Sequence, residues 1–92
     1  MSRITIKNFL SKEGTSDLQI SLLKTVENRF KRRVEFEYLN AGDNQSQVSK
    51  YNIKTIPTII IECNGKEKER FVGLTQELFL RKAIEKTLGE CR

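Results

Sequence analysis

The 92-residue sequence predicts an α/β fold, with about four strands in one mixed sheet and helices on both of its faces. Three observations predict this fold. An alternating apolar segment, an amphipathic segment and a second alternating segment follow one another, which is typical of a β-α-β unit with parallel strands. Two further strand-like segments flank Asn64-Gly65, and a second amphipathic segment comes last. The predicted order is β-α-β-(α)-β-β-α within a single domain, residues 1–92.

The first half of the chain supplies the β-α-β unit. Isoleucines alternate with polar residues over about residues 3–10, which predicts a strand. The next helix is expected to begin near Ser16 or Asp17, because Ser16 and Gln19 match a capping box. Its buried stripe is predicted to comprise Leu18, Leu22, Leu23, Val26 and Phe30. The segment VEFEYLN (34–40) alternates again, which predicts the parallel partner strand.

The second half predicts a hairpin followed by a helix. Residues 41–53 are polar and carry only a weak signal for a short helix. Asn64-Gly65 supplies the positive φ angles of a type I′ turn, so PTIIIEC (57–63) and KEKERFV (66–72) are predicted to be antiparallel strands. A last helix is predicted over residues 75–88. Its apolar face comprises Leu80, Ala83, Ile84, Thr87 and Leu88.

Composition restricts the classes of function. Histidine is absent, which removes Ser-His-Asp and Cys-His nucleophile pairs and the commonest transition-metal ligand, so we expect neither a metal nor another cofactor. No signal peptide or membrane-spanning run is recognisable, so a cytoplasmic protein without membrane association is expected. The net charge is +5, but the basic run NRFKRR (28–33) lacks an interleaved aromatic platform, so we expect no nucleic-acid partner.

Residues 51–74, YNIKTIPTIIIECNGKEKERFVGL, resemble the C-terminal half of the thioredoxin fold. A helix-end tyrosine, an Ile-Pro-Thr element, a strand, an Asn-Gly hairpin and a Val-Gly pair occur in that family in this order, and the length is similar to its small glutaredoxin-like members. The resemblance implies that the Ile56–Pro57 bond is cis and that the unpaired Ile56 backbone docks an extended peptide. It also implies that Gly73 keeps this groove open, because a side chain there would crowd it. From the residues alone, a trans proline that begins an edge strand is the alternative.

The sequence lacks the Cys-x-x-Cys motif of this family. Redox-active members carry the motif where the first strand meets the first helix, because the helix N-terminus lowers the pKa of the first thiol. The resemblance places Gly14 and Asp17 at the two cysteine positions, with Thr15 and Ser16 between them. A hydroxyl group cannot exchange disulfides at neutral pH, so Thr15 and Ser16 are expected to cap the helix.

The two cysteines lie elsewhere in the sequence. Cys63 ends the strand that Pro57 begins, about 20 Å away by the rise of a strand, and is expected to be a partly buried small apolar residue. Cys91 lies in a C-terminal tail that is expected to fray. Either thiol is open to adventitious oxidation or to an intermolecular disulfide, and neither is expected to support thioredoxin-type turnover.

These features predict a thioredoxin-fold module without a redox centre, which binds a protein or peptide partner as a monomer and is not an enzyme. The predicted groove comprises Thr15, Ser16, Ile56, Pro57 and Gly73. One alternative is a thiol-disulfide oxidoreductase that uses Cys63, Cys91 or the thiol of a partner. A second alternative is a regulatory protein similar to the circadian-clock protein KaiB, which is also thioredoxin-like and lacks the motif.

Overall fold

The structure, a computed structural model, describes residues 3–11 and 17–91. Its elements in chain order are β1 (Ile4–Leu10), α1 (Asp17–Phe30), β2 (Glu35–Asn40), the 3-10 helix η1 (Ala41–Asp43), α2 (Gln45–Lys50), β3 (Thr58–Cys63), β4 (Lys66–Val72) and α3 (Glu77–Glu90). This is the predicted order of elements. The predicted α/β fold with one mixed sheet of four strands is therefore confirmed.

The sheet has the strand order β2-β1-β3-β4. β1 and β2 are parallel, as the crossover through α1 requires, whereas the β1–β3 and β3–β4 pairs are antiparallel. Asn64 and Gly65 have φ angles of 53° and 85° and join β3 to β4, which confirms the predicted hairpin.

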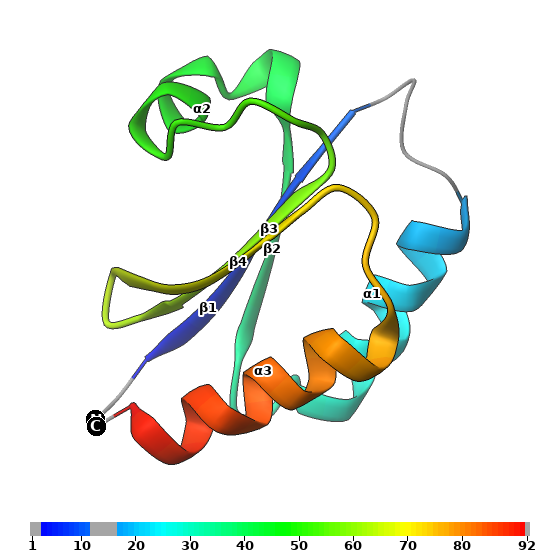
Figure 1. The fold of residues 1–92 in the computed structure, drawn as a ribbon, viewed down its shortest axis with the longest axis vertical. Helices are drawn as coiled ribbons and strands as arrows, with labels where there is room; N and C mark the ends of the chain where they lie inside the picture. Colours follow the sequence, from blue (N-terminus) through cyan, green and yellow to red (C-terminus); the bar gives the residue numbers. More distant parts are fainter. Residues whose placement is uncertain (1–2, 12–16, 92) are drawn as a thin grey trace.

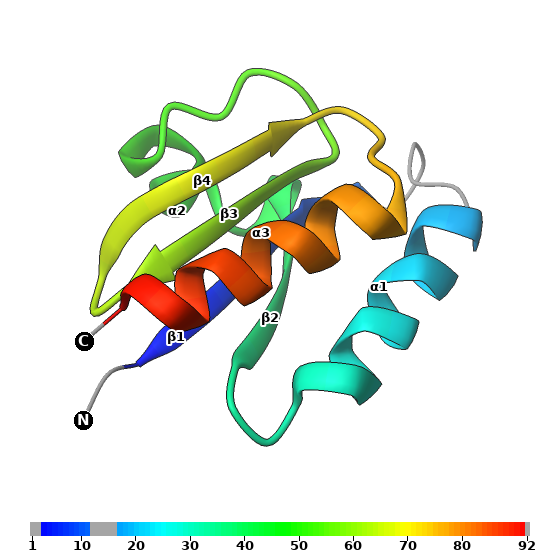
Figure 2. The same cartoon turned by 60° about the horizontal axis from the view of Figure 1, so that its bottom comes forward.

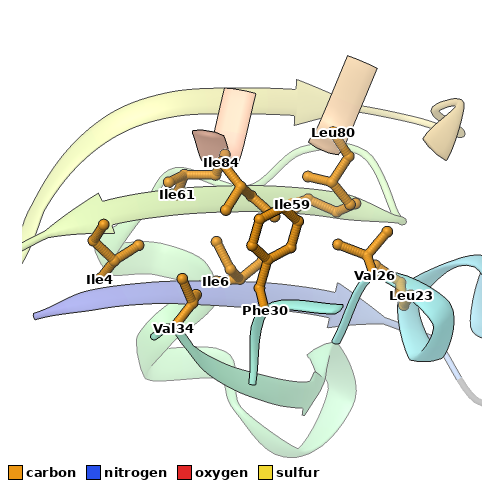
Figure 3. Close-up of a cluster of buried hydrophobic side chains, with 10 residues drawn as sticks. All are labelled: Ile4, Ile6, Leu23, Val26, Phe30, Val34, Ile59, Ile61, Leu80 and Ile84. Atoms are coloured by element: carbon orange, nitrogen blue, oxygen red, sulfur yellow. The ribbon is translucent and has the colours of Figure 1, made fainter. Parts of the chain in front are cut away.

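Helices lie on both faces of the sheet, with α1 and α3 on one face and α2 on the other (Figure 1). The larger core lies beneath α1 and α3 and is drawn in Figure 3: Ile4, Ile6, Leu23, Val26, Phe30, Val34, Ile59, Ile61, Leu80 and Ile84. A smaller core contains Phe9, Ile53 and Ile60 and packs against Val48 and Tyr51. Because successive strand residues point to opposite faces, Ile59 and Ile61 face α3 whereas Ile60 faces α2.

The buried stripe of α1 differs from the prediction at its first residue. Leu23, Val26 and Phe30 are buried as predicted, but Leu18 is 83% exposed and Gln19 is only 3% exposed. Gln19 stands four residues before Leu23, on the same face of the helix, whereas Leu18 lies about 100° further round. The polar Gln19 is therefore buried at the start of the helix, where the apolar pattern predicted that Leu18 would be buried.

The direction of α3 determines which end of the sheet its last residue reaches. Thr58 pairs with Val72, so β4 ends beside the beginning of β3. α3 then runs back across the sheet, and its 14 residues span about 21 Å. The 6 residues of β3 span about 20 Å. The end of α3 consequently lies next to the β3–β4 hairpin (Figure 2).

Candidate redox site

A disulfide bond between Cys63 and Cys91 joins the end of β3 to the end of α3. The two Cα atoms are 5.8 Å apart, a usual separation for a disulfide. Cys63 faces α3 because it follows Ile59 and Ile61 at alternate positions of β3. Cys91 comes directly after the last residue of α3. The adjacent ends of β3 and α3 thus bring together two cysteines that lie far apart in the sequence.

The disulfide corrects the expectations for both cysteines. The N–H of Cys91 donates a hydrogen bond to the Thr87 carbonyl at 2.7 Å, and its side chain packs against the larger core, so the residue is not part of a frayed tail. The bond forms within one chain rather than between two chains. Cys63 is buried, at 7% exposed, but as half of a disulfide rather than as an isolated apolar side chain. The matching lengths of β3 and α3 are the signal that could have predicted this pair.

Asn64 orients a hydrogen-bond donor toward the disulfide. Its Nδ2 donates to the Cys63 Sγ at 3.7 Å. Its Oδ1 accepts a hydrogen bond from the Arg3 N–H at 2.8 Å, and its own N–H donates to the Arg3 carbonyl at 2.7 Å. These bonds to the chain just before β1 hold the amide in place beside the sulfur.

A cavity of about 320 Å³ adjoins the disulfide. Its lining residues are Cys63, Asn64, Lys66, Lys68 and Glu90. Lysine ammonium groups and an amide N–H both favour a thiolate over a neutral thiol. Beside Cys63 the cavity thus has two lysines and the Asn64 amide, which favour a thiolate, against one carboxylate, that of Glu90, which disfavours it.

The structure describes part of the groove predicted at the opposite end of β3. The Ile56–Pro57 peptide bond is cis, Pro57 is buried and Ile56 is half-buried. The Gly73 N–H donates to the Pro57 carbonyl at 2.8 Å, which ties the end of β4 to the proline. Asp17 is the first residue of α1. The other predicted positions, Gly14, Thr15 and Ser16, lie outside the described residues.

Gly73 adopts a backbone conformation that favours glycine. Its φ angle is 84°, in the left-handed region that favours glycine. A Cβ atom built at Gly73 would meet no atom of the described residues within 4 Å. The space beside Gly73 is therefore open, and the crowding of a docked peptide by a side chain there stays a prediction. Four large apolar side chains between the end of β4 and the first turn of α3 are exposed: Val72, Leu74, Leu78 and Phe79.

A second cavity, of about 480 Å³, lies on the other face of the sheet and is polar. Glu62, one of its lining residues, is 4% exposed and accepts a hydrogen bond from the Tyr51 hydroxyl. Burial and this carboxylate raise the pKa of Tyr51. Lys7 lies nearby and pairs with Glu37 at 3.0 Å. The Tyr51–Glu62 pair is not among the sequence predictions, although the position of Glu62 two residues after Ile60 places it on the α2 side of β3.

Both cysteines of the sequence are in the disulfide, so any thiol chemistry of this chain takes place there. Among residues 3–11 and 17–91, no three His, Cys, Asp or Glu side chains gather where they could hold a metal ion. None of the helices formed by these residues is both long and apolar enough to cross a membrane.

Known proteins resemble this chain in sequence and in fold. A family model described as Thioredoxin matches residues 19–86. The thioredoxin of Rickettsia typhi is 27% identical over 75 residues, which cover 82% of this chain and 71% of the relative. An M-type chloroplastic thioredoxin of Brassica napus is 32% identical over 56 residues, which cover 61% of this chain and 32% of the relative.

Solved structures give the same result for the fold. The thioredoxin of Fasciola hepatica matches with a TM-score of 0.74 and 27% identity, over 91% of this chain and 80% of the other. Thioredoxin-2 of the malaria parasite, described as a component of the protein secretion machinery, matches with a TM-score of 0.85 and 20% identity. This second match covers 92% of this chain and 84% of the other, and it supports the fold alone.

These relatives overturn the function predicted from the sequence. The missing motif predicted a non-catalytic binding module, whereas the relatives are named thioredoxins, which are redox proteins. That prediction was wrong, and the relatives support the alternative, a thiol-disulfide oxidoreductase, instead. The family model covers most of the chain, and this protein therefore belongs to the thioredoxin family, although it lacks the Cys-x-x-Cys motif.

Proposed function

We propose that this chain is a thiol-disulfide oxidoreductase whose redox couple is Cys63–Cys91. The disulfide bond itself carries the proposal, because it contains every cysteine of a chain whose relatives are thioredoxins. The oxidoreductase would thus work at the hairpin end of β3 rather than at the start of α1.

The reaction is a thiol-disulfide exchange in two steps. A thiolate of a dithiol protein attacks one sulfur of the Cys63–Cys91 bond, which breaks as a mixed disulfide forms, and the other cysteine leaves as a thiolate and takes up a proton. The second thiolate of the substrate then attacks the mixed disulfide and releases this chain with two thiols. Two electrons and two protons pass from the substrate to this chain, and the reverse reaction reduces a substrate disulfide.

The packing of α3 supports reversible opening of the bond. Leu80 and Ile84 have no exposed surface, and Thr87 is only 3% exposed, so the helix is anchored in the core along most of its length. Cys91 lies one turn beyond Thr87. Reduction would therefore release the last turn of α3 without removing the contacts that hold the helix on the sheet.

We place the contact with protein substrates at the Pro57 end of β3. Val72 at the end of β4, Leu74 in the following loop and Phe79 in the first turn of α3 are exposed, and exposed apolar side chains are typical of a protein-binding surface. The disulfide is about 20 Å away along β3. A folded protein substrate spans that distance, whereas a small thiol reaches the disulfide without touching this surface.

An insulin-type disulfide reduction assay tests the proposal. The wild-type chain, with dithiothreitol as electron donor, is expected to reduce the substrate faster than dithiothreitol alone. Cys63→Ser, Cys91→Ser and the double variant are each expected to lose that acceleration, because a single thiol cannot complete both exchange steps. Ser46→Ala, an exposed change on α2, serves as the control and should retain the activity. Full activity in either cysteine variant would contradict the proposal.

A further inference from the structure

We propose that the incoming thiolate attacks Cys91, that Cys63 is the sulfur that leaves, and that Asn64 is a positioning residue which stabilises the leaving thiolate. This inference rests on the proposed oxidoreductase function and specifies which sulfur is attacked and which sulfur leaves in the exchange reaction. It follows from three differences between the two cysteines: access, freedom to move and electrostatic surroundings.

The two sulfurs differ first in access. Cys63 is 7% exposed and lies inside the sheet, between Ile4 of β1 and Lys66 of β4. Cys91 is half-buried and lies beyond the end of α3, outside the sheet. Exchange occurs at the sulfur that a thiolate can reach, so access favours attack on Cys91.

The two cysteines also differ in their freedom to move. A mixed disulfide attaches the substrate to the attacked sulfur, and that residue must make room for it. The backbone of Cys63 is paired with strands on both sides, so a substrate attached there would have to lie between β3 and α3. The backbone of Cys91 is held by the hydrogen bond to Thr87, at the end of a helix, and can turn outward with the substrate.

The electrostatic surroundings make Cys63 the better leaving group. Asn64 Nδ2 already donates to its Sγ at 3.7 Å, and the cavity beside it is lined by two basic residues, Lys66 and Lys68, and one acidic residue, Glu90. Cys91 instead lies at the C-terminal end of a helix, where the dipole disfavours negative charge, and it follows Glu90. The thiol that is more stable as a thiolate leaves faster, so Cys63 is expected to be the sulfur that leaves as a thiolate when the bond breaks.

The direction of the exchange can be read from the position of the mixed disulfide. The oxidised wild-type chain is treated with a small excess of 2-mercaptoethanol, quenched with acid and mapped by mass spectrometry after proteolysis. We expect the mercaptoethanol adduct on Cys91, with a free thiol at Cys63. An adduct that is mainly on Cys63 would overturn the direction and leave the proposed function intact. A disulfide that stays closed at both cysteines would overturn the proposed function as well.

The role of Asn64 is tested with Asn64→Asp and Asn64→Gly. Both replacements tolerate the positive φ angle at this position, so the turn is kept. Asn64→Asp retains an oxygen that can accept from the Arg3 N–H but places a carboxylate beside Sγ, whereas Asn64→Gly removes both the donor to Sγ and the acceptor for Arg3 and adds no charge. We expect opening of the disulfide by 2-mercaptoethanol to slow by about tenfold in Asn64→Asp and by less in Asn64→Gly.

A second readout separates this role from a merely structural one. In a Cys91→Ser background, the pH at which Cys63 becomes reactive to iodoacetamide should rise when Asn64→Asp is added. Asn64→Gly should raise this midpoint by a smaller amount, because it removes a donor without adding a charge. A loss of stability alone would change neither midpoint in the folded protein. An unchanged midpoint in Asn64→Asp would overturn the positioning role.

Discussion

Pro57 and Cys63 lie at opposite ends of β3, since Pro57 directly precedes its first residue and Cys63 is its last. The groove that the family resemblance implies lies at the proline end, where Asp17 also begins α1. The two cysteine sulfurs are at the other end, about 20 Å away. The proposed redox site is therefore separate from the surface around the proline.

Reduction of the disulfide should lower the free energy of unfolding but leave the chain folded. The bond joins residues 28 positions apart in the sequence, and closing a loop of this size stabilises a fold by roughly 2–4 kcal/mol. We predict that Cys91→Ser lowers the free energy of unfolding in urea by about this amount. Reductant should lower the stability of the wild type to the level of Cys91→Ser and should leave the variant unchanged. A wild type that is indifferent to reductant would show that the bond does not form in solution.

The core beneath α3 should carry most of the remaining stability. Ile84 has no exposed surface and packs against Ile59 and Ile61 within the same cluster. We predict that Ile84→Ala destabilises the fold by about 2–5 kcal/mol, since it leaves a cavity in this cluster. Leu78→Ala, at a 43% exposed position of the same helix, should change stability by only about 0.5 kcal/mol. Equal losses in thermal or urea unfolding would be inconsistent with the packing described.

The Tyr51–Glu62 pair should make stability depend on alkaline pH. Burial and the carboxylate raise the pKa of Tyr51 above its ordinary value of 10.0, so the unfolded chain releases the phenolic proton at a lower pH than the folded chain. The stability that this residue contributes is present below pH 10 and is lost as the pH rises through and above this value. The loss should appear in unfolding free energies measured between neutral and alkaline pH.

Tyr51→Phe tests this dependence. At neutral pH the variant should be less stable by about 1–3 kcal/mol, because the buried Glu62 loses the hydroxyl that donates to it. Its stability should then fall less steeply above pH 10 than that of the wild type. Tyr38→Phe is the matched variant, since Tyr38 donates to Glu27 at 2.7 Å and its pKa is raised for similar reasons. A tyrosine absorbance titration of Tyr38→Phe with a midpoint at the ordinary value would contradict the prediction for Tyr51.

The exposed apolar side chains between the end of β4 and the first turn of α3 should matter for protein substrates only. We predict that Phe79→Ser raises the KM for a protein disulfide by about tenfold, since burying an aromatic ring on binding contributes about this much affinity. The rate with a small disulfide should not change, because that substrate reaches Cys63–Cys91 directly. Lys82→Ser, one turn further along α3, is the control. Equal effects on the small and the protein substrate would argue against a docking surface at this end.

Local features of the fold were predictable from the sequence, and contacts between distant residues were less so. Asn64-Gly65 demands a tight turn by its own backbone preferences, so the hairpin followed directly. The face of α1 was ambiguous at its start, because an apolar Leu18 precedes a polar Gln19 and only packing decides which one is buried. A hydrophobic pattern cannot anticipate a polar residue in that position.

The site was harder to predict than the fold for a physical reason. The family resemblance concerned the Pro57 end of β3 and the start of α1, whereas the Cys63–Cys91 contact depends on the relative lengths of β3 and α3. Both lengths are close to the predicted ones, but α3 continues to Glu90 rather than ending at residue 88, so Cys91 follows the helix directly instead of lying in a frayed tail. Combining the two lengths with the antiparallel course of β4 would have brought the cysteines together.

Reduction of the native protein by dithiothreitol tests the Cys63–Cys91 redox couple most directly. The gain of two hydrogen atoms is followed by mass spectrometry, and global unfolding is followed in parallel by hydrogen exchange of the β1 and β3 amides. We predict that the disulfide opens much faster than the sheet unfolds and closes again on addition of oxidised dithiothreitol. Reduction that proceeds only at the rate of global unfolding would identify the bond as a structural crosslink and would contradict its role in catalysis.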